Sequence, residues 1–579
     1  MKANKPSGSL EITKKSPLLL IVMWGIWVII LILTVPGLWR TFAGLNSIVA
    51  KVLFVPFSFC LVLFWFYGIY HFVLLIFSYL PRPALGDHAR VVARQQSFTP
   101  RVAVIYTTLN DFNKEAVSTL LDQDYPNYHV FLLDVSTRSE FKARVDAIHQ
   151  ENPTTTTLYR LLPRQGFKAR SLNDTLRDAV GPEYEFFAVC DADNYWPNDF
   201  LSCMVPYLIL DKRIGFVQAK PTVTGRKQGK FASDFEVAID ASWSLHQLPR
   251  GRYGLLMCMG HSVVVRREAW ERSAGYPEIV QEDTAFTMAL RRHGYIGIFA
   301  PEVAVGEEFP EDFVRIRRRQ YRLVQADTEI WQTQMPSFLK SHTVSLIEKI
   351  DLLARTTRLP IQAATLIYLL LAFSFIPLAN HGTLSAYSID TALGPLITPT
   401  LIIITLLVAI SPFFPFFIYL KRKPLKILPL VFNGVTLHYT FLVTALASLV
   451  IYFLKGRAMF LVTGTQDGAA VQEQPVGRVR RLIQRLNADS PIVLAFDIVF
   501  GAFLLYVGIV SGGLILVSIA VVLLSALAIR RWGWHNPVIS VARPLPLILI
   551  IVGLVTSLSG IIGTQSLYLA LAVLSVLLF

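Results

Sequence analysis

Asp191 and Asp193 are the residues of this 579-residue sequence whose types and spacing most directly suggest chemistry. They follow the apolar run 184–190, which is typical of a buried β-strand. In an extended chain, residues i and i+2 project to the same side, roughly 6–7 Å apart, so the two carboxylates can hold one divalent cation and a ribose hydroxyl. Hard cations such as Mg²⁺ and Mn²⁺ take oxygen ligands and share them with diphosphates. The alternative is that both acids cap the helix that follows near Pro197.

Glu282 and Asp283 form a second acidic pair, directly before the helical stretch 284–292. A helix dipole favours carboxylates at its N-terminus, so capping alone would explain them. In the chemical interpretation Asp283, with Glu282 beside it, is the general base that takes a proton from an attacking hydroxyl. His261, in the polar segment 260–262, is expected to face the acceptor of that reaction.

A third group consists of five arginines in one short segment: Arg315, Arg317, Arg318, Arg319 and Arg322. A solvated helix face, or a contact with lipid headgroups, would explain most of them. One or two of these arginines are instead candidates for stabilising a leaving diphosphate, because guanidinium groups match the geometry of phosphate oxygens.

The elements that must position these residues alternate between strand-like and helical runs. Apolar runs at 101–108, 128–134 and 184–190 end in polar or acidic residues, and a helical stretch at 114–122 separates the first two. Such alternation, with acids after the strands, is the pattern of an open α/β sheet, which binds ligands beyond the carboxyl ends of its strands. We therefore expect an α/β fold with a nucleotide-type crevice.

The rest of the chain is too apolar for a fully soluble protein. Apolar residues make up 53% of the sequence and charged residues 16%, and the mean hydropathy is +0.49, whereas ordinary soluble domains carry roughly 25% charged residues. The stretches expected to span a membrane are 17–39, 52–80, 359–378, 393–420, 491–510, 513–529, 545–558 and 561–579. Two spans thus precede the polar insert, and the others follow it.

Positive residues indicate how these stretches are oriented. The formal net charge is +14, from 54 Lys and Arg against 40 Asp and Glu, and cytoplasmic anchoring accounts for such an excess in a membrane protein. Basic clusters flank both ends of the apolar stretch 427–454, so we expect an interfacial or re-entrant helix there. Asp497, two turns into the next span, is expected to lie near the membrane interface, with a functional role as the alternative.

Two kinds of function are disfavoured. No basic-aromatic motif for nucleic-acid binding stands out. The four cysteines are far apart and form no CxxC pair, so neither a disulfide framework nor a zinc site is expected.

The polar motifs together resemble those of the family 2 glycosyltransferases, specifically the membrane-embedded polysaccharide synthases typified by cellulose and hyaluronan synthases. The matching segments follow in the family's order: Thr108-Leu109-Asn110-Asp111 for Thr-x-Asn-Glu, Asp134-Val135-Ser136 for Asp-Asp-Gly/Ser, 164–169 for Arg-x-x-x-Lys-Ala, Asp191-Ala192-Asp193 for Asp-x-Asp, and Gln281-Glu282-Asp283 for Thr-Glu-Asp. The resemblance implies that the donor nucleotide is bound by Thr108, Asp111, Asp134, Lys168, Asp191, Arg319 and Arg322, the metal by Asp191 and Asp193, and that Asp283 is the catalytic base.

Two features concern the acceptor. The family's Gln-x-x-Arg-Trp corresponds to 319–323, which keeps Arg322 but holds Leu323 where the family's Trp stacks on the terminal acceptor sugar. Phe460-Leu461-Val462-Thr463 resembles the Phe-x-Val-Thr gating loop that follows an interfacial helix in cellulose synthases. Phe460, Val462 and Thr463 are therefore expected to act in gating or acceptor binding, and this agrees with the interfacial helix expected at 427–454.

The resemblance implies an inverting glycosyltransferase that moves a hexose from a nucleotide-diphosphate sugar, with a UDP-sugar expected, to a growing β-linked polysaccharide. Export through its own membrane channel, a Mg²⁺ or Mn²⁺ cofactor, and a cytoplasmic GT-A (Rossmann-like) domain in a multi-pass protein of the plasma (inner) membrane are also implied. Its partners would be the nucleotide-sugar donor, a glycan acceptor and the lipid bilayer, without nucleic acid. A non-processive transferase acting on a lipid-linked or short acceptor, and a non-enzymatic membrane protein such as a transporter, remain as alternatives.

The expected domains are two N-terminal membrane helices at 1–81, the GT-A domain at 82–340, an amphipathic helix with two membrane helices and the interfacial helix at 341–456, the gating loop and linker at 457–490, and C-terminal membrane helices at 491–579.

Overall fold

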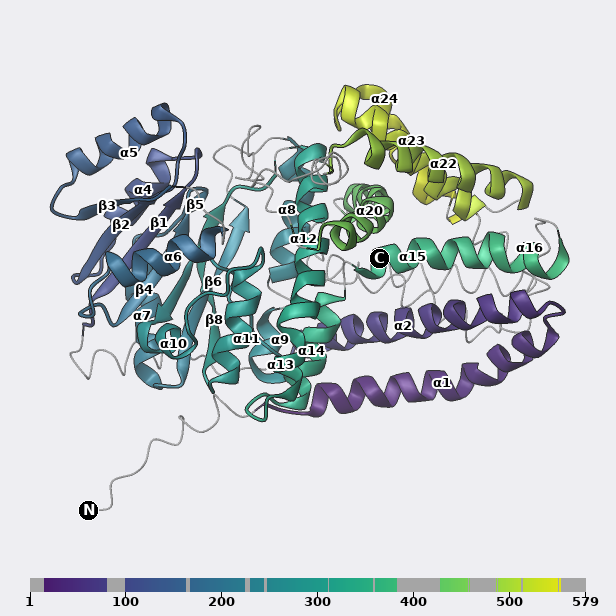
Figure 1. The fold of residues 1–579 in the computed structure, drawn as a ribbon, viewed down its shortest axis with the longest axis horizontal. Helices are drawn as coiled ribbons and strands as arrows, with labels where there is room; N and C mark the ends of the chain where they lie inside the picture. Colours follow the sequence, from purple (N-terminus) through teal and green to yellow (C-terminus); the bar gives the residue numbers. More distant parts are fainter. Residues whose placement is uncertain are drawn as a thin grey trace, which may run out of the picture.

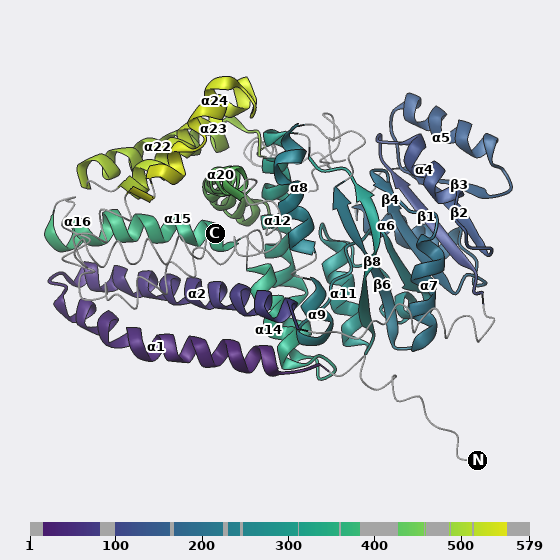
Figure 2. The same cartoon turned by 180° about the vertical axis from the view of Figure 1, so that it is seen from behind.

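The computed structural model describes residues 15–80, 99–162, 167–223, 230–243, 247–310, 312–357, 360–382, 427–456, 458, 486, 488–511, 514–549 and 551–552. An α/β domain occupies one side of the molecule and long helices the other (Figures 1 and 2). Between them lies α12 (Phe313–Thr333), with the shorter helices α13 (Met335–Lys340) and α14 (Leu346–Thr356) beside it.

The α/β domain is built on one eight-stranded sheet with the order β3-β2-β1-β4-β7-β6-β8-β5. Its strands are β1 (Val102–Thr108), β2 (Tyr128–Asp134), β3 (Thr156–Arg160), β4 (Phe186–Asp191), β5 (Asn194–Tyr195), β6 (Ile214–Val223), β7 (Val263–Arg266) and β8 (Ile296–Glu307). Strands β1 to β4 pair in parallel, whereas β7 runs antiparallel to its neighbours β4 and β6. The sheet is therefore mixed, and its parallel half contains the three strands expected from the sequence.

Helices cover both faces of this sheet because its central strands are apolar on both sides. In β1, Val102, Val104 and Tyr106 belong to one buried cluster and Ala103 and Ile105 to the other, as the period of two of a strand requires. The first cluster includes residues of α4 (Lys114–Leu121), α5 (Ser139–Glu151) and α7 (Phe200–Leu210), and the second includes residues of α6 (Phe167–Asp178), α10 (Arg267–Arg272) and α11 (Glu282–Arg292). Helices α8 (Lys230–Ser242) and α9 (Leu248–Tyr253) complete the domain.

Within the described ranges, five helices are long and apolar enough to cross a membrane by length and composition: Leu18–Gly44, Ile48–Ser78, Ile361–His381, Pro429–Lys455 and Pro491–Val510. They correspond to α1 (Leu18–Gly44), α2 (Ile48–Ser78), α15 (Pro360–Leu370) continued by a π-helical turn (Leu371–Phe375) into α16 (Ile376–His381), α20 (Ile427–Lys455) and α22 (Pro491–Ser511). The helices α23 (Leu514–Trp532) and α24 (Pro537–Ala542) follow. The stretches expected to span at 393–420 and 561–579 lie outside the described residues.

Helix α20 takes a different direction from the other long helices. Both views show α1, α2 and α15 from the side and α20 nearly end-on (Figures 1 and 2). A polar stripe of α20 packs on α12, where Ser448 Oγ donates a hydrogen bond to the backbone oxygen of Tyr321 at 2.7 Å. The expected interfacial helix stays a prediction, and α20 also qualifies as a span by length and apolarity.

Buried polar contacts attach the α/β domain to the long helices. Asp351 of α14 accepts hydrogen bonds from Arg250 Nε of α9 at 3.2 Å and from the Tyr70 hydroxyl of α2. On α12, Arg317 donates to Thr444 of α20 at 2.6 Å and to Asp497 of α22 at 2.8 Å. Asp497 therefore lies beside an arginine of α12 and is 2% exposed.

Candidate active site

The carboxyl ends of β2, β1 and β4 meet at one edge of the sheet. The register places Thr108 of β1 opposite Asp134 of β2, and Thr107 opposite Asp191 of β4. Thr107 Oγ1 donates a hydrogen bond to Asp191 Oδ1 at 2.7 Å. The structure thus brings together the strand ends that carry the predicted donor residues.

Asp134 is fully buried and both of its carboxylate oxygens are engaged. Oδ1 accepts a hydrogen bond from the backbone N–H of Ser136 at 2.9 Å, and Oδ2 accepts one from Arg160 Nε at 2.7 Å. Arg160 ends β3 and is the register partner of Asp134, a pairing that no sequence motif marked. A nucleotide base that approached Asp134 would therefore meet an ion pair rather than a lone acid.

A hydrogen bond joins the loop after β1 to the loop after β2. Asn110, whose φ is +59°, accepts a hydrogen bond on Oδ1 from the backbone N–H of Thr137 at 2.9 Å. Asp111 accepts one from Thr108 Oγ1 at 2.9 Å, and burial raises the pKa of Asp111 to about 6. Thr108 and Asp111 thus hold each other at the predicted nucleotide site, and their contact with a nucleotide stays a prediction.

Lys168 reaches from α6 into the same edge. Its ammonium donates to Asp191 Oδ1 at 2.5 Å and to the backbone oxygen of Gly260 at 2.9 Å. Burial acts to lower the pKa of Lys168, but Asp191 and Glu282 outweigh burial and raise it, so the ammonium stays charged. Lys168 is therefore a fixed cation between the two acidic pairs, whereas 163–166, which contains the expected Arg164, lies outside the described residues.

Asp193 lies among other acids. Burial raises its pKa well above the usual range, and Glu307, Asp191 and Asp111 add to the rise. A hard divalent cation takes carboxylate oxygens as ligands, and it would relieve the mutual repulsion of these crowded acids. In the described part of the chain, no group of three or more His, Cys, Asp or Glu side chains is placed to hold a metal ion. Asp191 and Asp193 would therefore share a cation with ligands from a diphosphate or water.

Glu282 and Asp283 begin α11 next to Gly260. Gly260 has φ +73°, and a Cβ at this position would lie 3.2 Å from Asp283 Cβ, so the loop approaches the acid closely. Burial raises the pKa of Glu282 to about 7, against the effect of Lys168. Asp283 Oδ1 accepts the backbone N–H of Thr284 at 2.6 Å, so one of its oxygens contributes to the helix start.

Three of the five clustered arginines pair with acids away from this site. The pairs are Arg315–Asp312 at 3.6 Å, Arg317–Asp497 at 2.8 Å and Arg318–Asp489 at 2.5 Å. Arg317 is only 6% exposed, so for this residue a solvated face and a headgroup contact are both wrong.

Arg322 is the clustered arginine that lies among the site acids. Burial and the neighbouring Arg319 lower the pKa of Arg322, while Glu282, Asp283 and Asp191 act in the opposite direction. The Arg319 guanidinium lies over the Phe309 ring, 5.9 Å from its centre. The family-like Arg322 is thus close enough to the acids to act with Lys168.

Arg355 of α14 is a cation near the site that sequence reasoning missed. Its Nη2 lies 3.8 Å from Met259 Sδ, one residue before Gly260. Burial lowers the pKa of Arg355 to about 10, against the attraction of Asp283 among other acids. No motif distinguishes Arg355, because it lies in an amphipathic stretch after the soluble insert, and only the packing of α14 brings it here.

Of the residues expected to act on the acceptor, the structure describes some and leaves others outside the described ranges. Leu323, at the position of the family's Trp, packs in a cluster with Ala363 of α15 and Ala445 of α20. Phe460, Val462 and Thr463 lie outside the described residues. His261 lies beside Gly260 and Glu307 rather than next to Leu323, with its Nε2 3.9 Å from Glu307 Oε1.

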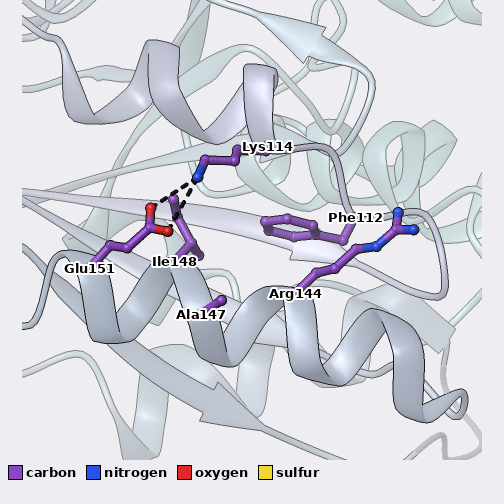
Figure 3. A pocket seen from close by; sticks show the side chains of 6 residues that line it. All are labelled: Phe112, Lys114, Arg144, Ala147, Ile148 and Glu151. Atoms are coloured by element: carbon purple, nitrogen blue, oxygen red, sulfur yellow. Dashed lines mark hydrogen bonds and ion pairs between the residues drawn. The ribbon is translucent and has the colours of Figure 1, made fainter.

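A hollow of about 290 Å³ between α4 and α5 is separate from these residues (Figure 3). It is lined by Phe112, Lys114, Arg144, Ala147, Ile148 and Glu151. Lys114 and Glu151 form an ion pair at 3.0 Å along one side. None of the predicted site residues lines this hollow, so it is not the expected nucleotide crevice.

Comparison with known proteins supports the family resemblance. The model of "Glycosyl transferase family group 2" matches residues 186–463, which begin at β4 and include Asp191, Asp193, Asp283 and Arg322. A glucomannan 4-beta-mannosyltransferase of Cyamopsis tetragonoloba is 25% identical over 192 residues, 33% of this chain and 36% of that protein. A probable glucomannan 4-beta-mannosyltransferase of Arabidopsis thaliana is 23% identical over 189 residues, 32% of this chain and 43% of that protein. The aligned parts thus span less than half of these relatives.

Solved structures show weaker likenesses. A mannosyltransferase from Pyrobaculum calidifontis in complex with GDP-Man and Mn²⁺ is 20% identical with a TM-score of 0.37, covering 66% of this chain and 99% of that one. TarS of S. aureus with UDP-GlcNAc is 15% identical with a TM-score of 0.28, covering 51% and 89%. No argument about the site rests on likenesses of this size. The mixed α/β sheet and the acids at its strand ends nevertheless agree with the match of residues 186–463 to the glycosyl transferase family group 2 model, and helices of membrane-spanning character flank this α/β domain.

Proposed function

We propose that the chain is an inverting hexosyltransferase that moves a sugar from a nucleotide diphosphate to a growing β-linked glycan. The observation that carries this proposal is the meeting of cations and acids at one sheet edge. Lys168 Nζ lies 2.5 Å from Asp191 Oδ1. Arg322 is close enough to Asp191 and Asp283 for their negative charges to act on its pKa. Such a site can bind an anionic leaving group beside a base.

The cations would stabilise the departing diphosphate. In transfer, negative charge develops on the diphosphate as its bond to the sugar breaks. Fixed cations in a desolvated site stabilise such charge strongly, because they need no reorganisation during the reaction. Lys168 and Arg322 would do so from opposite elements, α6 and α12.

Asp191 and Asp193 would hold a Mg²⁺ or Mn²⁺ ion together with the diphosphate. When bound, such an ion neutralises charge on the phosphate oxygens. Asp191 would also contact the ribose, while Asp134, fixed by Arg160, would lie at the base.

Asp283 would take the proton from the attacking hydroxyl. Attack on the face opposite the diphosphate inverts the anomeric carbon, so an α-linked donor gives a β-linked product. Burial raises the pKa of the neighbouring Glu282 to about 7, so this acid would be partly neutral near that pH.

The membrane-type helices would place this reaction at a bilayer. We propose that the α/β domain faces the cytoplasm of a plasma-membrane protein and that the product leaves between the long helices. The excess of 54 Lys and Arg over 40 Asp and Glu supports a cytoplasmic anchor, and the end-on direction of α20 supports an interfacial helix (Figure 1).

A second candidate is a non-processive transferase with a lipid-linked or short acceptor. Leu323 favours it, because leucine cannot stack on a sugar as the family's Trp does, and Leu323 is instead packed among α15 and α20.

The test is a panel of radiolabelled nucleotide sugars given to the purified protein with Mg²⁺ or Mn²⁺. The curated relatives are named as mannosyltransferases, so GDP-mannose belongs in the panel beside UDP-hexoses. Incorporation into a product that a β-specific glycanase digests would support the proposal, and product length would separate the two candidates. Absence of both transfer and donor hydrolysis with every sugar would contradict it.

A further inference from the structure

His261 is held in place by an unusual backbone. Gly260 before it has φ +73° and Ser262 after it has φ +48°, a region that residues other than glycine rarely adopt. Ser262 is fully buried, its N–H donates to the backbone oxygen of Val189 at 2.7 Å, and its hydroxyl donates to Asn194 at 3.1 Å. Residues kept in such conformations cluster at functional sites because the surrounding structure fixes them for a purpose. Here the two positive φ values and the hydrogen bonds of Ser262 fix the backbone on both sides of His261.

The ring has no hydrogen-bonding partner of its own in the described part of the protein. Its Nδ1 is buried without a hydrogen bond, although buried polar atoms are nearly always paired. Its Nε2 lies 3.9 Å from Glu307 Oε1, which is too long for a hydrogen bond. The side chain is 16% exposed and that of Glu307 is 25% exposed, so a ligand can reach the space between them.

The distance fits one hydroxyl group. A hydroxyl oxygen could lie about 2.8 Å from both His261 Nε2 and Glu307 Oε1. The Nε2···O···Oε1 angle at this oxygen would then be about 90°. The hydroxyl would accept a hydrogen bond from Nε2–H and donate one to the carboxylate. The ring proton is expected on Nε2, because a buried N–H without an acceptor is rarer in proteins than a buried acceptor without a donor.

The position of this pair relates it to the donor side of the reaction. Glu307 is the acid that most strongly raises the pKa of Asp193. The backbone of Gly260, next to His261, accepts a hydrogen bond from Lys168 and approaches Asp283. The gap is therefore close to the groups assigned to the metal and the diphosphate and, through Gly260, to the group assigned to the base, and the transferred sugar must reach both.

We propose that His261 and Glu307 bind one hydroxyl of the sugar being transferred and so help to select the donor. This inference rests on the proposed function and revises the expectation that His261 faces the acceptor. It gives a role to the segment 260–262, whose backbone conformation is not needed for holding the metal or the catalytic base.

The test compares binding of nucleotide diphosphates with and without the sugar. UDP, UDP-glucose, GDP and GDP-mannose are titrated calorimetrically into the purified full-length protein with Mn²⁺, and the nucleotide pair that binds the wild type is then used for the variants. His261→Ala should weaken binding of that nucleotide sugar by up to about tenfold, the upper end expected for one hydrogen bond between neutral groups, and leave the nucleotide diphosphate within about twofold. His342→Ala, which changes an exposed histidine in the segment between α13 and α14, is the matched control and should alter neither.

Three further variants keep the result interpretable. His261→Asn retains a polar side chain beside Ser262, so unchanged thermal midpoints in both His261 variants exclude misfolding as the cause. Glu307→Gln should weaken only the nucleotide sugar, and the double variant His261→Ala/Glu307→Gln should lose less than the sum of the two, because both side chains contact one hydroxyl.

Several results would overturn the inference. Equal losses for the nucleotide diphosphate and the nucleotide sugar would place His261 at the ribose or phosphates, and a weaker Mn²⁺ affinity in the absence of nucleotide would make it a metal ligand. Unchanged binding of both would remove it from the donor site. A wild-type protein that binds neither nucleotide diphosphate nor nucleotide sugar would instead contradict the proposed function itself, which is a distinct outcome.

Discussion

Replacing Asp283 by Asn separates a catalytic base from a residue that only stabilises the start of α11. Asp283 is the second residue of this helix, after the N-cap Gln281, and the contact from Thr284 N–H to Asp283 Oδ1 at 2.6 Å can be kept by an amide oxygen. The variant should therefore fold with a thermal midpoint close to that of the wild type. An amide cannot take the proton of the acceptor, so turnover should fall ~10²–10⁴-fold, a rise of about 2.7–5.4 kcal/mol in the barrier.

The charges around Asp283 also predict how the variant binds the nucleotide diphosphate. Asp283 offsets the positive charge of Arg322 and also raises the pKa of Lys168. Without Asp283, these cations keep the same positions with one fewer neighbouring anion. The nucleotide diphosphate should then bind as tightly as in the wild type, or more tightly.

The assay pairs turnover at saturating donor with calorimetric titration of the nucleotide diphosphate. Lys349→Gln, a charge-removing change on α14 away from the site acids, is a control for non-specific effects. A variant with near-normal turnover, or one whose loss of rate is matched by weaker nucleotide binding, would refute the assignment of Asp283 as the base.

Other predictions concern the cation, the nucleotide site and pH. Asp193→Ala should abolish transfer, and wild-type activity should disappear in excess EDTA and return with Mn²⁺; full turnover in EDTA would contradict the expected cation. Arg160→Gln leaves a fully buried carboxylate without its ion pair, so the protein should lose about 1–3 kcal/mol of stability and bind nucleotide diphosphate more weakly, as thermal shift and calorimetry would report; no change in either measurement would argue against the pair. The pKa of Glu282 is raised to about 7, so the stability that its neutral form contributes is present below its unfolded pKa of roughly 4.3 and lost as pH rises through 7. The thermal midpoint should therefore fall over this range by less in Glu282→Gln than in the wild type, and parallel curves would show that burial does not shift this acid.

The strand-end acids were predictable because apolar runs and their endings are local features of the sequence. The expected runs 101–108, 128–134 and 184–190 correspond to β1, β2 and β4. Parallel strands share the edge at which they end, so Asp134 and Asp191 could be placed together without knowing the remaining topology.

Partners across the sheet were not predictable in the same way. Arg160 pairs with Asp134 because β3 joins the sheet in one particular register, and a shift of one residue would have turned its side chain to the other face. Arg355 is near Asp283 only because α14 is docked by its own polar contacts, including that of Asp351 with Arg250. Such non-local packing leaves no periodic signal in a single sequence.

The arginine cluster shows that a sequence motif does not reveal which neighbour each side chain of a helix contacts. Arg317 and Arg322 are five residues apart, which is about 500° of helical turn, or about 140° around the axis. One therefore points toward α22 and the other toward the site acids. The sequence predicted a cationic helix but not how its charges divide between two neighbours.

The pairing of Arg317 with Asp497 also sets an order for the biogenesis of the protein. The two residues are 180 positions apart, and at ~5–20 residues per second the ribosome needs roughly 9–36 s to cover that interval. During this time α12 has left the ribosome with an arginine whose carboxylate does not yet exist. A buried guanidinium without a counter-ion is unfavourable, so we expect α12 to take its final place only after α22 has been made. We therefore expect a nascent chain arrested before Asp497 to be recognised by chaperones and proteases.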